Sequence, residues 1–135
     1  MKIRKAGAQD IAAAVELAAA LGLDYPGMEN DRIWVAEDQG RIMGLVALRS
    51  HPDCRELVSL GVDPEYRNRG LGRKLVEALV DEAEGDIHLA TIIPRFFEAF
   101  GFVETTSIPE GMAKDPSWCD GCPKELCSIM VRIDA

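Results

Sequence analysis

The amino-acid sequence predicts a protein of the α/β class, in which strands and helices alternate within one domain of residues 1–135. Three observations support this prediction. The chain of 135 residues has the length of one typical domain. Its apolar residues switch several times between the spacing of two that is typical of strands and the spacing of three to four that is typical of helices. The sequence also contains no repeat, low-complexity tract or linker that would separate two domains.

Seven segments are predicted as strands, because they are short apolar and β-branched runs bounded by turn signals. They are residues 2–6, the two arms of a hairpin within 33–50, and residues 56–62, 86–92, 102–106 and 126–133. Gln39-Gly40 is predicted as the turn of the hairpin, and Asp63-Pro64 ends the strand that follows it.

Three segments are predicted as helices, because their apolar residues recur on one face and their flanking residues suit helix ends. They are Ile11–Leu21, which Gly22 follows, Leu71–Glu84, and the short helix Pro94–Gly101. Residues 24–32, between the first helix and the hairpin, have the composition of a loop.

The composition indicates a soluble globular protein and argues against several partners. Hydrophobic residues make up 47% of the chain, and no apolar run approaches the roughly 18 residues that cross a membrane. The N-terminus has no apolar export segment, so we expect a cytoplasmic location. With a net charge of −8, the chain is not expected to bind nucleic acid or an anionic membrane surface, because such binding requires positive charge.

Positive charge is nevertheless concentrated in residues 66–75, YRNRGLGRKL, between a predicted strand and a predicted helix. A helix start presents backbone N–H groups and the positive end of the helix dipole, and Gly70 and Gly72 allow a ligand to approach the backbone. The segment therefore predicts an anion site. The alternative is that the glycines only make the turn and the arginines are solvated. Neither the third glycine of a Rossmann fingerprint nor the G-K-[ST] ending of a P-loop is present.

Residues 57–83 resemble the acetyl-CoA motif of the GCN5-related N-acetyltransferases (GNAT), whose core pattern [QR]-x-x-G-x-[GA] is met by Arg67, Gly70 and Gly72. Residues 96–105, FFEAFGFVET, resemble the next motif of this family. The resemblance implies the GNAT fold, with a mixed, mostly antiparallel central sheet of about six to seven strands flanked by helices. It also implies an enzyme that transfers an acetyl group from acetyl-CoA to a primary amine of a small molecule.

The resemblance further implies which residues contact acetyl-CoA. In this family the strand before the loop pairs with the pantetheine arm, and the backbone amides of the loop bind the diphosphate. The expected contacts are Leu60, Gly61, Val62, Arg67, Asn68, Arg69, Gly70, Leu71, Gly72, Arg73 and Phe97. Lys74 adds to the local positive potential.

Glu56 is the candidate catalytic base. On a regular strand its side chain would share a face with Val58, Leu60 and Val62, where desolvation is expected to raise the pKa of the carboxyl group. A base is needed because an amine is mostly protonated at neutral pH. Its separation from Arg67 also matches the place where several GNAT members carry a glutamate base. The alternative is a solvated carboxylate that pairs with Arg55.

The general acid of the family is missing from its usual place. Many members carry a tyrosine in the short helix of the second motif, where this chain has Phe96 and Phe97. Phe97 is expected to pack against the coenzyme arm or the core. The missing tyrosine favours an alternative function, a non-catalytic module that binds acetyl-CoA, whereas Glu56 favours catalysis.

Three cysteines, Cys119, Cys122 and Cys127, form the pattern C-x2-C-x4-C. A structural zinc site needs four ligands, and Cys54 is not expected to be the fourth, because it begins the strand whose other end carries the loop. No metal site is predicted. Packed thiols are favoured, and an oxidised pair or metal binding stays open.

Residues 108–133 resemble the C-terminal hairpin of N-acetylglutamate synthase-like acetyltransferases, which implies the α-amino group of glutamate as the acceptor. Cations that could hold a dicarboxylate are Arg32, Arg95, Lys114 and Lys124. A polyamine, an aminoglycoside or a protein N-terminus is the alternative acceptor, because an acidic surface attracts cations. A homodimer is left open beside a monomer.

Overall fold

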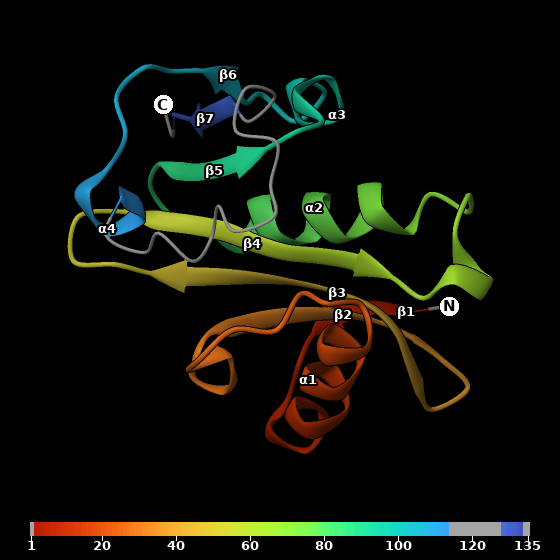
Figure 1. The fold of residues 1–135 in the computed structure, drawn as a ribbon. Helices are drawn as coiled ribbons and strands as arrows, with labels where there is room; N and C mark the ends of the chain where they lie inside the picture. The colour runs from red at the N-terminus through yellow and green to blue at the C-terminus, as the bar shows by residue number, and fades with distance from the viewer. Residues whose placement is uncertain (1, 114–127, 134–135) are drawn as a thin grey trace. The chain divides into compact units, whose positions relative to one another are not determined.

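A computed structural model describes residues 2–113 and 128–133 of the chain. The strands in chain order are β1 (Lys2–Lys5), β2 (Arg32–Asp38), β3 (Arg41–Ser50), β4 (Arg55–Val62), β5 (Ile87–Thr91), β6 (Val103–Glu104) and β7 (Ser128–Arg132) (Figure 1). The α-helices are α1 (Ile11–Ala20), α2 (Leu71–Glu82), α3 (Pro94–Glu98) and α4 (Glu110–Ala113). Short 3₁₀ turns cover Ala8–Asp10, Met28–Asn30 and Pro64–Tyr66.

The strands form one seven-stranded sheet in the order β1-β2-β3-β4-β5-β7-β6. The registered pairs are antiparallel except β4 with β5, which run parallel. This topology confirms the predicted fold class, a mixed and mostly antiparallel sheet flanked by helices.

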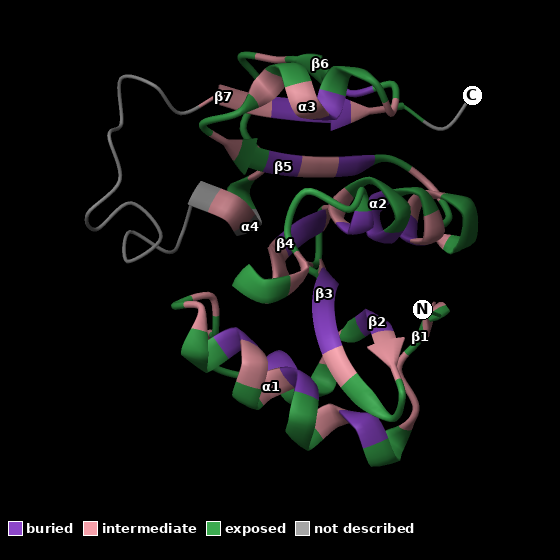
Figure 2. Ribbon diagram, turned by 90° about the vertical axis from the view of Figure 1, so that its right-hand side faces the viewer, coloured by how far each residue is buried: buried purple, intermediate pink, exposed green. Residues whose placement is uncertain are grey.

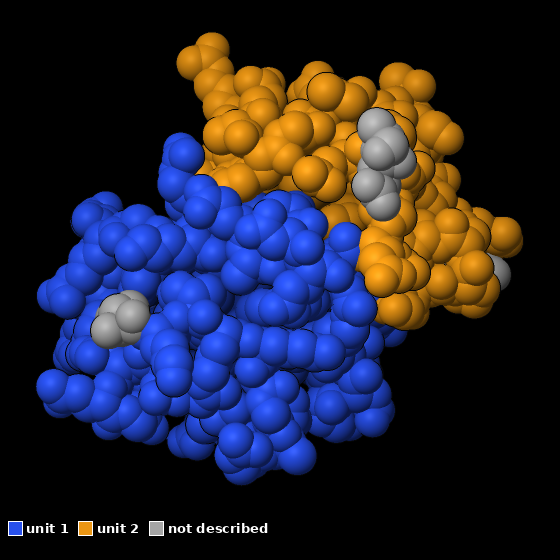
Figure 3. Space-filling view, turned by 180° about the vertical axis from the view of Figure 1, so that it is seen from behind, with its two compact units in different colours: residues 1–49, 57–83 blue, residues 50–56, 84–135 orange. Residues whose placement is uncertain are grey.

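The chain divides into two compact units, and each is described by itself (Figure 3). Unit 1 comprises residues 1–49 and 57–83, and unit 2 comprises residues 50–56 and 84–135. The predicted extent of one domain over residues 1–135 stays a prediction.

In unit 1, α1 and α2 lie on opposite faces of the sheet (Figure 1). Their placement explains why residues 33–36 of β2 and 43–48 of β3 are buried without a break, since a strand covered on both faces has no solvent side (Figure 2). Four apolar residues of α2 face this core: Leu71, Leu75, Val76 and Leu79. The indole Nε1 of Trp34 donates to a carboxylate oxygen of Glu82 at 2.8 Å, which joins β2 to the last turn of α2.

In unit 2, β7 lies between β5 and β6 and pairs antiparallel with both. Phe97 of α3 is only 4% exposed and meets Phe102 edge to face, with ring centroids 5.8 Å apart. The short helix of the second motif is therefore anchored by its aromatic residues.

The predicted elements agree with the structure except at their ends. α2 ends two residues early, at Glu82, because Ala83 is extended and Gly85 adopts a φ of +78°. α3 begins at Pro94 as predicted but ends at Glu98, and β6 covers only two of the five residues predicted. The 3₁₀ turns and α4 were not predicted, because segments of three or four residues are too short for a periodic pattern. None of the described helices is long and apolar enough to cross a membrane.

Candidate functional site

The junction between β4 and α2 has an unusual backbone conformation. Asn68 and Gly70 have φ angles of +67° and +75°, in the left-handed region that favours glycine. Gly70 caps α2, and no side chain accepts a hydrogen bond there. The N–H of Lys74 donates to the carbonyl of Gly70 at 3.2 Å, and helix geometry leaves the N–H groups of Leu71 and Gly72 without an acceptor inside the helix. These amides can bind an anion.

The arginines of the junction also contact the protein itself. Nε of Arg67 donates to the carbonyl of Val62 at 3.2 Å, and the guanidinium of Arg69 lies 4.8 Å from the ring centroid of Tyr66. The hydroxyl of Tyr66 in turn donates to Asp38 at 3.1 Å. Both arginines therefore help to hold the loop while leaving positive charge beside it. Residues 67–70 are exposed, as are Arg73 and Lys74 in the first turn of α2.

The strand before the junction is irregular at Ser59, whose φ is +58°. A residue in this conformation does not continue the pleat of a strand, so the regular alternation assumed from Glu56 to Val62 ends there. Glu56, Leu57 and Val58 are buried in succession, whereas Leu60 and Val62 are partly exposed. The hydroxyl of Ser59 donates to the carbonyl of Leu23 at 2.6 Å, which fixes the irregularity.

Gly61 lies against the segment that follows α1. A Cβ at this position would come within 2.8 Å of Leu21 and 2.5 Å of Leu23, distances that real contacts do not reach. A larger residue at position 61 would therefore displace the ends of these two leucine side chains in unit 1.

Glu56 is deeply buried and paired with a histidine. Its side chain is 3% exposed, and Oε1 lies 2.7 Å from Nε2 of His51, which is 13% exposed. The solvated carboxylate considered as the alternative is therefore not observed. His51 was not predicted as a site residue from the sequence, because its contact with Glu56 depends on the turn between β3 and β4. In that turn the backbone N–H of His51 donates to the carbonyl of Cys54 at 2.8 Å.

A second histidine stands opposite Glu56 on the neighbouring strand. His88 of β5 is the register partner of Glu56, and its Nδ1 is buried without a hydrogen-bond partner among the described residues. Burial lowers the pKa of His88 below its ordinary value. The neutral imidazole is therefore the favoured form at neutral pH.

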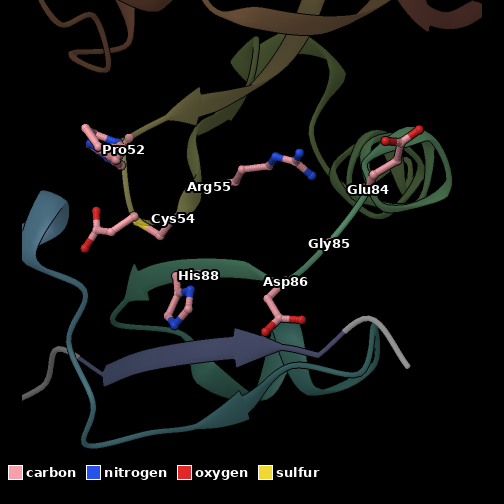
Figure 4. Close-up of a pocket in the computed structure, with 9 residues that line it drawn as sticks. Pro52, Cys54, Arg55, Glu84, Gly85, Asp86 and His88 are labelled. Atoms are coloured by element: carbon pink, nitrogen blue, oxygen red, sulfur yellow. The ribbon is translucent and has the colours of Figure 1, made fainter.

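Unit 2 contains a cavity of about 430 Å³ next to this cluster (Figure 4). Its walls come from the turn before β4 and the segment that enters β5: His51, Pro52, Asp53, Cys54, Arg55, Glu84, Gly85, Asp86 and His88. Burial, with the nearby charges of Asp53 and Glu56, raises the pKa of the Cys54 thiol to about 11, so this cysteine is a poor nucleophile. Glu56 does not line the cavity, but its partner His51 does.

The remaining predicted residues lie elsewhere. Phe97 belongs to the aromatic core of unit 2, and Arg95 is exposed on α3. Arg32, in unit 1, has its guanidinium 5.5 Å from the ring centroid of Trp34. Lys114, Lys124, Cys119, Cys122 and Cys127 lie outside the described residues. Across residues 2–113 and 128–133, no group of three or more His, Cys, Asp or Glu side chains could hold a metal ion.

Comparison with known proteins identifies the family. The family model described as "Acetyltransferase (GNAT) domain" matches residues 29–104, more than half of the chain. An uncharacterized N-acetyltransferase of Chlorobaculum tepidum is 31% identical over 100 residues, which are 69% of this chain and 63% of that protein. The L-amino acid N-acyltransferase MnaT of Escherichia coli is 30% identical over 102 residues, 65% of this chain and 59% of that protein. The chain thus spans about three fifths of these curated relatives, and it belongs to the GNAT acetyltransferase family.

Solved structures share the fold. N-acetylglutamate synthase of Neisseria gonorrhoeae, complexed with coenzyme A and N-acetyl-glutamate, superposes with a TM-score of 0.72 at 23% identity, over 98% of this chain and 34% of that chain. Rv2747 of Mycobacterium tuberculosis, in complex with CoA and NLQ, has a TM-score of 0.72 at 21% identity and covers 100% of both chains.

Proposed function

We propose that this chain is an acetyl-CoA-dependent N-acetyltransferase that acts on a primary amine of a small molecule. The observation that carries the proposal is the exposed junction before α2, where left-handed residues and a helix start without a side-chain cap present backbone donors beside several cations. Family membership supports the same activity, and so do the names of the two curated relatives.

Acetyl-CoA supplies the reaction with an acetyl thioester. We propose that the amides of residues 67–73 bind its diphosphate, while Leu60, Gly61 and Val62 of β4 pair with the pantetheine arm. The coenzyme A bound in the two solved relatives supports this cosubstrate. A contact between the cosubstrate and Phe97 stays a prediction. The ring of Phe97 packs against Phe102.

Glu56 is the proposed base. As the amine nitrogen attacks the thioester carbonyl, the C–N bond forms and the C–S bond breaks, and the carboxylate of Glu56 takes the proton that the nitrogen releases. The departing thiolate takes a proton from water. The burial of Glu56 supports its role as the base, because water then competes little for the carboxylate.

The first acceptor to test is the α-amino group of glutamate. The resemblance of residues 108–133 to N-acetylglutamate synthase-like proteins supports this choice, as does the N-acetyl-glutamate held by the synthase of Neisseria gonorrhoeae. The name of MnaT, an L-amino acid N-acyltransferase, points to the same class of acceptor. A cytoplasmic location is a further expectation, and a homodimer stays open beside a monomer.

A specific observation favours a second class of acceptor, a polyamine or aminoglycoside. The chain has a net charge of −8, and three carboxylates, Asp53, Glu84 and Asp86, line the cavity of unit 2. A cationic amine is attracted to such a surface. A non-catalytic module that binds acetyl-CoA is the remaining alternative.

Release of free thiol from acetyl-CoA, measured with a panel of amines, tests the proposal. We expect turnover with at least one small primary amine, together with thermal stabilisation by the cosubstrate. Stabilisation without turnover on any amine would favour the non-catalytic module. The absence of both thermal stabilisation and turnover would overturn the proposal.

A further inference from the structure

We propose that His51 is a positioning residue that holds the buried carboxylate of Glu56 ionised and oriented for proton transfer. This inference rests on the proposed function, in which Glu56 is the base. It assigns a role to a residue outside the β4 and α2 motifs, in the turn between β3 and β4.

The first step is the cost of burying Glu56. Only 3% of its side chain is exposed, and an ionised carboxylate in such surroundings is unfavourable unless donors compensate it. Nε2 of His51 lies 2.7 Å from Oε1, the distance of a short charge-assisted hydrogen bond. Because an ionised carboxylate can only accept, the proton between them belongs to Nε2 whenever Glu56 is charged.

The second step is the fixed position of His51. Its backbone N–H donates to the carbonyl of Cys54 at 2.8 Å, which closes the turn that places the imidazole over the second residue of β4. With Oε1 held by this donor, the other oxygen of Glu56 keeps a defined direction. A base must present a lone pair in such a direction to the amine.

Other groups that can carry charge lie around the His51–Glu56 pair, in the walls of the cavity of unit 2. They are Asp53 and Cys54 in the turn, Arg55 on β4, His88 on β5, and Glu84 and Asp86 at the entry to β5. His88 is not suited to replace His51, because its buried Nδ1 has no partner among the described residues and burial favours its neutral form. Among the two histidines of the chain, His51 alone has a hydrogen bond to Glu56 in the described residues.

The proton balance follows from this arrangement. Glu56 takes one proton from the attacking amine and becomes a neutral acid, and that proton returns to solvent after the acetylated product leaves. His51 keeps its own proton on Nε2 throughout. Donation from Nε2 lowers the free energy of the ionised form and so restores the carboxylate for the next turnover.

The test compares two polar substitutions, His51→Gln and His51→Asn. The amide of glutamine reaches about as far as Nε2 and can donate to Glu56, whereas the shorter asparagine cannot. The primary readout is the ¹³C shift of the Glu56 carboxyl group, assigned by its loss in Glu56→Gln and followed against pH. We expect protonation of Glu56 to move to higher pH by about one unit in His51→Asn and to stay near the parent value in His51→Gln.

The kinetic readout is the acid limb of kcat/KM against pH. His51→Asn should lose rate by about tenfold at neutral pH and show the same displacement of the acid limb, while His51→Gln recovers most of the rate. His88→Gln is the matched control, since it makes the same change opposite Glu56 on β5 without touching the hydrogen bond. Calorimetry with acetyl-CoA should give similar affinities for all three variants.

Equal carboxyl titrations in the parent, His51→Gln and His51→Asn would overturn the inference. A loss of rate that is the same at every pH and in both variants would also overturn it, because it would indicate a purely structural role. The carboxyl titration does not depend on turnover. If no amine is acetylated but Glu56 titrates as described, the proposed function fails, while the conclusion that His51 stabilises the ionised carboxylate stands.

Discussion

The junction before α2 and the His51–Glu56 pair use different chemical groups of the chain. The junction uses backbone groups: exposed left-handed residues and a helix start that has no side-chain cap. The pair uses side chains: a buried carboxylate and a partly exposed imidazole, whose Oε1 and Nε2 atoms lie 2.7 Å apart. Binding a constant phosphate group requires donors in a fixed geometry, whereas moving a proton requires a group whose charge can change.

Because of this difference, the two regions should tolerate different substitutions. The junction should tolerate changes of side chain that leave the backbone accessible, because its donors are present in every residue. The pair should tolerate only a change that keeps a hydrogen-bond donor at the position of Nε2, because one oxygen and one nitrogen carry the interaction. Substitutions can therefore separate binding of the cosubstrate from the chemical step.

The largest expected effect is on the chemical step alone. Glu56→Gln keeps the shape of the side chain but removes the base, so the rate should fall by a factor of order 10² or more near neutral pH. The loss should shrink at high pH, where the amine is deprotonated without help. Thiol release measured across pH checks this, with calorimetry as the control that acetyl-CoA still binds. An unchanged pH–rate profile would remove Glu56 from the mechanism.

The converse experiment weakens the binding of acetyl-CoA by blocking the backbone amides of the junction. A valine at Gly72 covers the amides at the start of α2, and the loss of about one hydrogen bond to a charged group should weaken acetyl-CoA binding by tenfold or more. Arg73→Ala, the matched control at the next residue, removes an exposed cation and should cost less than about fivefold. If the Gly72 variant binds as the parent does, the diphosphate lies elsewhere.

The preferred acceptor amine indicates whether cations or carboxylates near Glu56 bind the substrate. If cations hold a dicarboxylate, glutamate should be acetylated faster than lysine or spermidine by about tenfold, the worth of one charge-assisted contact. Competition among glutamate, aspartate, lysine and spermidine measures this preference. Faster acetylation of spermidine would reject the acidic acceptor and point to the carboxylates of the cavity, while leaving the acetyltransferase proposal intact.

The smallest effect concerns stability near the buried pair. Because the pKa of His88 is lowered in the folded protein, the unfolded chain binds more protons at acid pH, and the free energy of unfolding should fall as the pH drops below about 6.5. His88→Gln should lessen that fall. Urea unfolding of both proteins at pH 8 and pH 5 measures it, and an identical loss in the two would show that His88 does not contribute.

The sequence predicted the fold and the junction because both depend on local signals. Gly70 and Gly72 mark a helix start by themselves, and the apolar spacing of α2 marks its buried face. Glu56 was identified by its place on a strand, but its partner was not, because the contact between His51 and Glu56 depends on how one turn folds back. The left-handed conformation of Ser59 was also missed, since serine does not signal it as glycine does.

The hydrogen bond between Trp34 and Glu82 gives the protein an internal optical probe. The chain has two tryptophans, Trp34 and Trp118, so the variant Trp118→Phe would emit from Trp34 alone. The indole is fully buried, and its Nε1 is held by the last turn of the helix whose first turn follows Gly70. Its emission should therefore be blue-shifted in the native protein. Any ligand that tightens or loosens the docking of α2 would be seen as a change in wavelength or intensity, without a label.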